Sequence, residues 1–226
     1  MTLGGCFFAA TINNNRAQGF VNLNFESADT SGHSPGDMNV AIANAFPGWT
    51  GTFTSSLNTN TPSLVGYDVI SLGGPVISIN DSSSGINSIQ GVYSALLFGG
   101  GSNPLYSSAL SQTGMVPVGT ESLLLDANFS GASFVVTLGG QNISMTPLQS
   151  FSNYILYGGN VSSFAGQTVD LSIIEPPSTG TQPSSLLLDN IQFSPSSVPE
   201  PRALSLTALG GSLLIWRRWK RLNPKP

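Results

Sequence analysis

The sequence predicts an all-β protein, an antiparallel β-sandwich or jelly roll, followed by a C-terminal transmembrane helix. The chain of 226 residues contains 26 Gly and 15 Pro, and such a density of turn-forming residues suits many short strands better than long helices. Hydrophobic residues make up 40% of the chain, which is enough for one domain with a buried core. These two observations favour a single β-domain with short connections.

Short runs of alternating apolar and polar residues mark the expected strands. Residues 21–25 read Val-Asn-Leu-Asn-Phe, the period of a half-buried strand. Similar runs lie at 49–53, 64–72, 76–79, 92–98, 109–113, 123–128, 134–138, 154–157, 169–174 and 186–193. Gly139-Gly140 predicts a two-residue hairpin turn, because glycine adopts positive φ freely. We therefore expect one β-sandwich domain over residues 20–195, with a loop over 175–183 before the last strand.

The charged residues are unevenly distributed. No Lys or Arg lies between residues 17 and 201, whereas ten of the eleven acidic residues lie within 20–195 and give that part a formal charge of −10. Nucleic acid is therefore excluded as a partner, since the body has no cation to pair with phosphates. The only cysteine is Cys6, so the body forms no disulfide.

The first 19 residues are expected to be a signal peptide. A short apolar run ends in small residues near Ala17, but no basic segment precedes it, so the true start is expected to lie upstream of Met1. The run Leu3-Gly-Gly-Cys6 has the form of a lipoprotein box with no room for an apolar segment ahead of it. The alternative is that residues 1–19 form a first strand of the domain.

The C-terminal region, 196–226, combines three features in a fixed order. Val198-Pro199-Glu200-Pro201 comes first, an apolar segment of 14 residues at 203–216 follows, and Arg217, Arg218, Lys220 and Arg221 come last. As a helix the apolar segment is about 21 Å long, a marginal span that flanking Trp and basic side chains extend. The basic cluster predicts that the extreme C-terminus stays in the cytoplasm, with the acidic body outside.

This order of features resembles the PEP-CTERM sorting signal of Gram-negative bacteria. The resemblance covers 198–226 and departs from the usual pattern at Arg202, which directly follows the motif. It implies recognition by an exosortase, an intermediate anchored in the inner membrane, removal of the tail, and release to the cell surface or extracellular matrix. The alternative is a plain C-terminal membrane anchor.

The two ends of the body resemble a second family. Asn24-Phe25-Glu26 and the run from Leu188-Asp189 to Phe193 look like the first and last strands of galactose-binding-like jelly rolls, to which many carbohydrate-binding modules belong. That resemblance implies a structural calcium ion held in part by Glu26 and Asp189, and calcium does favour such hard oxygen ligands. The alternative is that both carboxylates are solvated surface groups.

Catalytic chemistry has little support in the sequence. His33 is the only histidine and lies in a Gly/Pro-rich loop, and no Gly-x-Ser-x-Gly motif is present. Glu121 and Asp126 are five residues apart, which places them on opposite faces of a strand, and Asp68, Asp81 and Asp170 are isolated. We therefore expect a protein that is not an enzyme.

Sugar binding requires fewer specialised groups than catalysis does, because exposed aromatic rings and amides are sufficient. The aromatic candidates are Trp49, Tyr67, Tyr93, Tyr106, Tyr154 and Tyr157, and Trp49, which follows a Pro-Gly turn, is the best of them. The sequence thus favours an exported, envelope-sorted, non-catalytic β-sandwich associated with extracellular polysaccharide or biofilm matrix. The alternatives are an extracellular glycan hydrolase or lyase on a jelly-roll fold, and a purely structural matrix protein.

Overall fold

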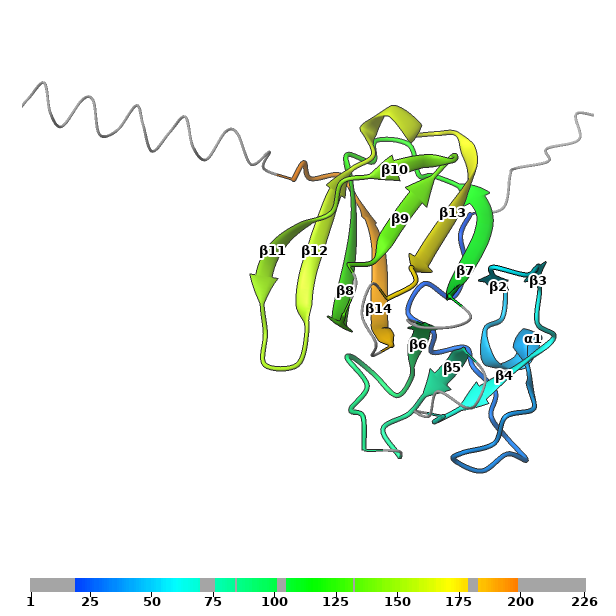
Figure 1. Cartoon of the computed structure of the whole chain (residues 1–226). Coiled ribbons are helices and arrows are strands. Elements are labelled where there is room, and N and C mark those ends of the chain that lie inside the picture. The colour runs from blue at the N-terminus through cyan, green and yellow to red at the C-terminus, as the bar shows by residue number, and fades with distance from the viewer. Residues whose placement is uncertain are drawn as a thin grey trace, which may run out of the picture.

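The computed structural model describes residues 19–69, 76–83, 85–100, 105–131, 133–178 and 183–198. These residues form two packed β-sheets with almost no helix (Figure 1). The prediction of an all-β sandwich is therefore confirmed. Within the described ranges, no helix has the length and apolar character needed to cross a membrane, and the predicted span at 203–216 lies outside them. Residues 1–18 also lie outside the described part.

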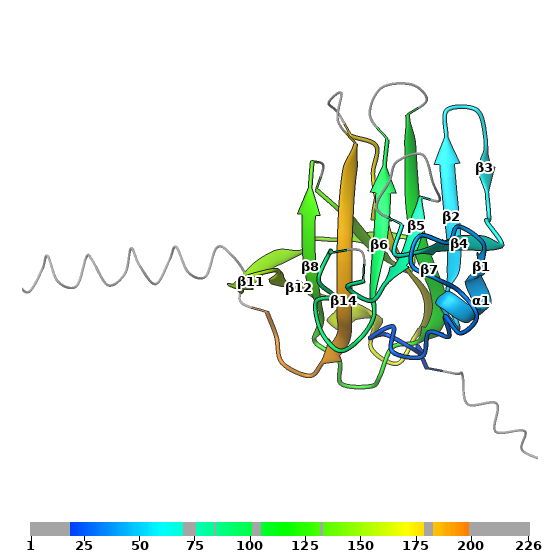
Figure 2. The same ribbon diagram turned by 90° about the horizontal axis from the view of Figure 1, so that it is seen from below.

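The larger sheet has eight strands and the smaller one six. In spatial order the larger sheet contains β1 (Val40–Ala41), β4 (Leu64–Tyr67), β5 (Ile77–Asn80), β6 (Ser94–Gly99), β14 (Ser184–Ser194), β8 (Ser122–Ser130), β12 (Ile155–Asn160) and β11 (Thr146–Ser150). The smaller sheet contains β10 (Gln141–Ile143), β9 (Val135–Leu138), β13 (Thr168–Glu175), β7 (Tyr106–Met115), β2 (Thr50–Ser55) and β3 (Thr59–Asn60). Figure 2 shows β6, β14 and β8 side by side.

The described pairs of strands are antiparallel, except that β4 and β5 run parallel. Helix α1 (Ile42–Ala45) and the 3-10 turn η1 (Ser162–Phe164) are the helical elements of the described ranges. Both are too short to cover a sheet, so the two sheets bury each other.

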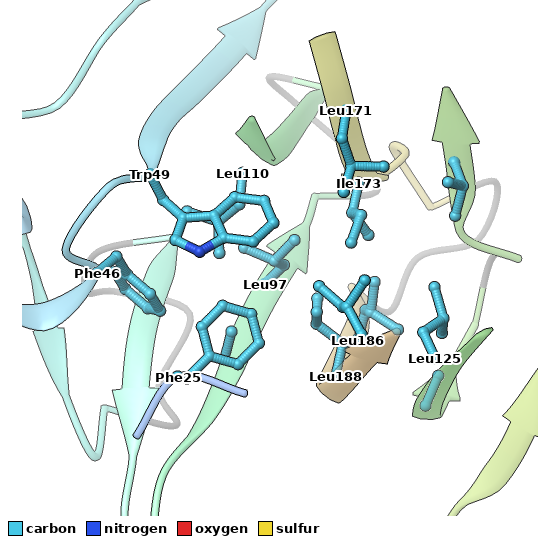
Figure 3. Close-up of a cluster of buried hydrophobic side chains, with 14 of the residues drawn as sticks. Phe25, Phe46, Trp49, Leu97, Leu110, Leu125, Leu171, Ile173, Leu186 and Leu188 are labelled. Carbon is cyan, nitrogen blue, oxygen red and sulfur yellow. The ribbon is translucent and has the colours of Figure 1, made fainter. Parts of the chain in front are cut away.

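The core lies between the sheets and is built by the period-2 alternation of the strands. Leu186 and Leu188 of β14 point inward toward Leu171 and Ile173 of β13, and all four are fully buried (Figure 3). The predicted hairpin turn is confirmed, because Gln141 pairs with Leu138 and the two intervening glycines have φ of 57° and 75°.

The predicted strand at 21–25 is wrong. Asn22 and Phe25 have φ of 49° and 58°, which no regular strand contains. Instead, the main chain of Val21 is held by the side-chain amide of Gln112, whose Nε2 donates to the Val21 carbonyl over 3.0 Å. The apolar-polar alternation of residues 21–25 arises because Phe25 enters the core. Its ring lies 5.9 Å from that of Phe46 and 5.7 Å from that of Trp49 (Figure 3).

We predict that Phe25→Ala lowers the free energy of unfolding by about 3–5 kcal/mol, because Phe25 is fully buried and its removal leaves a cavity between two aromatic rings. Urea denaturation of the variant and of the wild-type protein measures this change. Val118→Ala is the matched control, since Val118 is 85% exposed and its truncation should change the free energy by less than about 0.5 kcal/mol. Equal losses in the two variants would contradict the placement of Phe25.

Candidate functional site

Glu26 and Asp189, the two predicted calcium ligands, hold the same loop. The β5–β6 loop (residues 81–93, of which 84 is not described) crosses the outer face of the larger sheet. Oε1 of Glu26 accepts hydrogen bonds from the backbone N–H groups of Val92 and Tyr93 at 2.9 and 3.0 Å. The sequence analysis predicted that Glu26 and Asp189 share one site, and in the fold both residues hold the β5–β6 loop.

Asp189 is 1% exposed and accepts three hydrogen bonds. Its Oδ2 accepts from the Gln90 backbone N–H at 3.1 Å and from the Ser94 hydroxyl at 2.9 Å, and its Oδ1 accepts from the Asn190 N–H at 2.6 Å. Asn190 has φ of 50°, at a point where the pairing of β14 with β8 shifts register. This irregularity turns the Asn190 N–H toward the carboxylate of its own neighbour.

A third carboxylate, Asp126 of β8, lies directly opposite Asp189 in the ladder and is 2% exposed. Its Oδ2 accepts from Nε2 of Gln90 at 2.6 Å and from Nδ2 of Asn190 at 3.0 Å. Like charges at directly opposed positions destabilise a sheet unless they are satisfied. Here the Gln90 and Asn190 amides bridge the two carboxylates, a pairing that the sequence analysis did not predict.

Burial raises the pKa of Asp189 to about 6, although hydrogen bonds from Gln90, Ser94 and Asn190 act in the opposite direction. The nearby Glu26 carboxylate adds to the upward shift. Asp189 therefore gains a proton far more readily in the folded protein than in the unfolded chain.

The geometry around Glu26 and Asp189 does not fit a calcium ion. Oε1 of Glu26 and both carboxylate oxygens of Asp189 face N–H and O–H donors, whereas calcium requires a shell of oxygen lone pairs. Among the described residues, no group of three or more His, Cys, Asp or Glu side chains is placed to hold a metal. The arrangement anchors the β5–β6 loop by hydrogen bonds.

Trp49, predicted to be an exposed sugar platform, lies in the core. It is 5% exposed and its Nε1–H donates to the Asn22 carbonyl at 3.0 Å. Its ring packs against Phe25, so neither face is free for a ligand (Figure 3). The reason is that the turn before β2 directs the side chain inward, which the preceding Pro-Gly pair does not reveal.

Tyr67 and Tyr106 are also engaged within the fold. Tyr67 is 6% exposed and donates its hydroxyl to Oδ2 of Asp81 at 2.5 Å, and burial raises the pKa of this phenol to about 12. The ring of Tyr106 packs against Phe53 with centroids 5.6 Å apart. The Tyr93 hydroxyl lies 2.9 Å from the Thr30 hydroxyl.

Tyr154 and Tyr157 line a cavity of about 260 Å³ beside the β11–β12 turn. Figure 1 shows this turn at the free end of the β11–β12 hairpin, next to the end of β8. Phe151 and Tyr154 stack at the turn, with ring centroids 4.5 Å apart and planes 18° apart, and Phe151 is 43% exposed. The Phe151 N–H donates to the Tyr154 carbonyl at 2.9 Å, which closes the turn and holds the rings together.

Amides and buried aromatic rings complete the cavity. Asn128 and Asn153 contribute to its lining, and Nδ2 of Asn128 donates to the Asn153 carbonyl at 2.9 Å. Phe129 and Tyr157 also line it and pack against Phe134, with ring centroids 5.6 and 5.1 Å away. The sequence-based prediction missed Phe151, because it considered only Trp and Tyr as sugar-binding residues. The sequence feature that could have identified Phe151 is the Phe151-Ser-Asn-Tyr154 turn between two strands.

The lining of this cavity contains no Asp, Glu or His among the residues that the structure describes. The acidic residues considered as catalytic candidates serve elsewhere: Oδ1 of Asp68 accepts from the Asp81 N–H at 3.0 Å, and Asp170 accepts from the Thr113 hydroxyl. His33 lies 3.3 Å from Asp37 in its own loop. The cavity can therefore bind through ring faces and amides, but its described lining supplies no acid or base.

Comparisons with known proteins identify no family. No family model matches the chain, and a search of curated proteins finds no similar sequence. Among solved structures, one described as TmCBM61 in complex with beta-1,4-galactotriose is similar, with a TM-score of 0.44 and 11% identity over 78% of this chain and 98% of that chain. A likeness of this degree carries no inference about the ligand of this chain.

We predict that stability falls as pH rises through the titration of Asp189. The pKa in the folded state lies above the ordinary value of 3.8, so the stabilisation is complete below pH 3.8 and is lost as pH rises through about 6. The difference between these two pKa values corresponds to about 3 kcal/mol. Urea denaturation across this range should show a flatter dependence of stability on pH for Asp189→Asn than for the wild-type protein.

Glu121→Gln is the control for this measurement, because the Glu121 side chain is exposed just before β8. This variant should keep the wild-type dependence on pH. An Asp189→Asn variant that also keeps the wild-type dependence would show that Asp189 is ionised throughout the range, contrary to the raised pKa.

Proposed function

We propose that this protein is a non-catalytic glycan-binding β-sandwich that acts outside the cell. The observation that carries the proposal is the stacked, partly exposed pair Phe151 and Tyr154 beside a cavity lined by Asn128 and Asn153. An aromatic ring presents a flat apolar face to the C–H face of a sugar ring, while amides exchange hydrogen bonds with its hydroxyl groups. Polysaccharide is the ligand class that uses both features.

The size of the cavity favours binding of part of a polymer. Pockets for drug-sized ligands measure about 300–1,000 Å³, and this cavity of about 260 Å³ lies just below that range. It suits one or a few sugar units of a chain that continues across the surface. Phe151, at the exposed turn, is placed to contact the sugar that follows.

The proposed binding is non-catalytic. Hydrolysis of a glycosidic bond generally requires two carboxyl groups about 5–10 Å apart around the bond. The described lining of the cavity offers none, and the Asp126–Asp189 pair is buried beneath the β5–β6 loop. The hydrolase alternative therefore has no support at this site.

The location of the protein is inferred from its C-terminal sequence. The order of Val198-Pro199-Glu200-Pro201, the apolar segment and the basic cluster supports sorting by an exosortase, with an inner-membrane intermediate and release to the cell surface or matrix. The motif from Pro199 and the basic residues Arg217, Arg218, Lys220 and Arg221 lie outside the described residues.

The last described residue, Val198, packs on the larger sheet. A Cβ at Gly158 would lie 2.7 Å from Leu148 and 2.8 Å from Val198, so the glycine allows both side chains to lie on β12. The Ser122 hydroxyl donates to the Ser196 carbonyl at 2.7 Å and holds the segment that precedes the motif. The proposed sorting motif would therefore begin directly at the domain, and the described chain leading to it lies away from the β11–β12 turn (Figure 1).

We predict that Phe151→Ala and Tyr154→Ala each weaken polysaccharide binding about tenfold or more, equivalent to about 1.4 kcal/mol, because each removes an aromatic contact surface. Affinity electrophoresis against neutral polysaccharides, including dextran, galactan and the host's own extracellular polysaccharide, measures the effect. Leu57→Ala is the control, since Leu57 is 87% exposed in the turn between β2 and β3 of the smaller sheet. If the wild-type protein is not retarded by any of these polymers, the chain is better regarded as a purely structural matrix protein.

We predict that protein recovered from the matrix or medium of its native host lacks the residues beyond 198–201, because the tail is removed during sorting. Intact mass measurement of the membrane, matrix and medium fractions tests this expectation. Protein that retains Trp216 and Arg221 and remains in the membrane fraction would identify the tail as a plain anchor.

A further inference from the structure

Glu175 is a buried carboxylic acid that the proposed function does not use. It is the last residue of β13 and continues the inward alternation of Leu171 and Ile173, and all three side chains are fully buried. Neither carboxyl oxygen has a hydrogen-bond partner among the residues that the structure describes. A carboxylate in such a place is costly, because it has lost water and gained no partner.

No positive charge is available to Glu175 from the body of the protein. Lys and Arg are absent between residues 17 and 201, and His33 is engaged with Asp37 in its own loop. Of the strands packed around β13, β6 and β9 contain no titratable side chain, β7 contributes Tyr106, and β14 contributes Asp189. Asp170, at the other end of β13, is bound by the Thr113 hydroxyl.

The hydroxyl groups around Glu175 are directed elsewhere. Ser108, its ladder partner on β7, donates to the Phe98 carbonyl at 2.7 Å. Ser184 of β14 donates to the carbonyls of Gly99 and Pro176 at 3.3 and 3.1 Å. Burial raises the pKa of Glu175 to about 7, although the Ser184 hydroxyl acts in the opposite direction.

The strand register places one aromatic residue of the cavity wall level with Glu175. In the β13–β9 ladder Ile174 pairs with Val135, so Phe134, the preceding residue, lies level with Glu175. Phe134 is 8% exposed and packs edge-on against Tyr157 and Phe129. Both of these rings line the cavity, so Phe134 joins the strand level of Glu175 to the cavity wall.

We propose that Glu175 is a proton-dependent support of the cavity: the neutral acid keeps the aromatic wall formed by Phe134, Phe129 and Tyr157 in place, and ionisation loosens that wall. An ionised Glu175 must recruit water or move toward solvent, and either response disturbs the rings packed beside it. Where the cavity binds a glycan, a consequence that rests on the proposed function, binding weakens as pH rises from about 6 to about 8.

The direction of the effect follows from proton linkage. The pKa of Glu175 is raised in the folded state from its ordinary value of 4.5, so its contribution to stability is complete below pH 4.5 and is lost as pH rises through about 7. Asp189 titrates at a lower pH, about 6, and lies opposite Asp126 of β8, but its carboxylate is kept in Glu175→Gln, so comparison with this variant separates the two effects.

Hydrogen exchange of the full-length protein near pH 6 and pH 8, corrected for intrinsic exchange rates, tests the proposal. In the wild-type protein, peptides covering 127–131 and 154–158 should lose protection several-fold at the higher pH. Glu175→Gln, whose side chain has the same shape and no charge, should show no such loss, and Glu175→Met provides a second neutral variant. Glu121→Gln should behave like the wild-type protein.

Equal pH responses in wild-type protein and Glu175→Gln would overturn the proposal, as would a loss of protection spread uniformly over both sheets. Affinity for dextran, galactan and the host's own extracellular polysaccharide, measured at both pH values, separates the two claims. Failure to bind any of these polymers at either pH, with the exchange result as expected, removes the proposed function and leaves the role of Glu175 intact.

Discussion

The fold depends on satisfying carboxylates without any basic side chain. Between residues 17 and 201 there is no Lys or Arg, yet Asp68, Asp126, Glu175 and Asp189 are buried. Each buried carboxylate must therefore be stabilised by N–H and O–H donors or take up a proton. Asp126 and Asp189 have such donors, since the Gln90 and Asn190 amides and the Ser94 hydroxyl surround them, although burial still raises the pKa of Asp189. Glu175 has no such donors among the described residues and follows the second course.

Two parts of the sandwich meet this constraint in different ways. Toward the C-terminal part of β14, the Asp126–Asp189 pair and Glu26 fix the β5–β6 loop over the outer face of the larger sheet. Near the start of β14, Glu175 and a set of serine and glycine residues lie under the strand ends, and the β11–β12 turn presents Phe151 and Tyr154. The loop is held by many directed hydrogen bonds, whereas the cavity wall is held by aromatic packing, which tolerates small displacements and responds to a charge placed beneath it.

The sequence predicted the β-sandwich, most of its strands and the Gly139-Gly140 hairpin, because all of these follow from local periodicity and from glycine at positive φ. It also placed Glu26 and Asp189 together, although their shared role is to bind a loop. The periodicity of residues 21–25 was misleading, since an irregular segment that inserts one ring into the core looks like a short strand. Trp49, the Phe151–Tyr154 stack and buried Glu175 were not predictable, because their exposure depends on which strands pair across the sheets. The N-terminal segment and the sorting tail remain predictions.

Binding of a neutral glycan in the cavity beside the β11–β12 turn, through Phe151, Tyr154 and the neighbouring amides, is the central proposal. A two-dimensional NMR titration of the isotopically labelled protein with galactan oligosaccharides tests it most directly. We expect chemical-shift changes confined to residues 127–129 and 151–157, including the side-chain amides of Asn128 and Asn153, with the β5–β6 loop unaffected. Shifts centred on the β5–β6 loop, or no shifts with any neutral oligosaccharide, would contradict it.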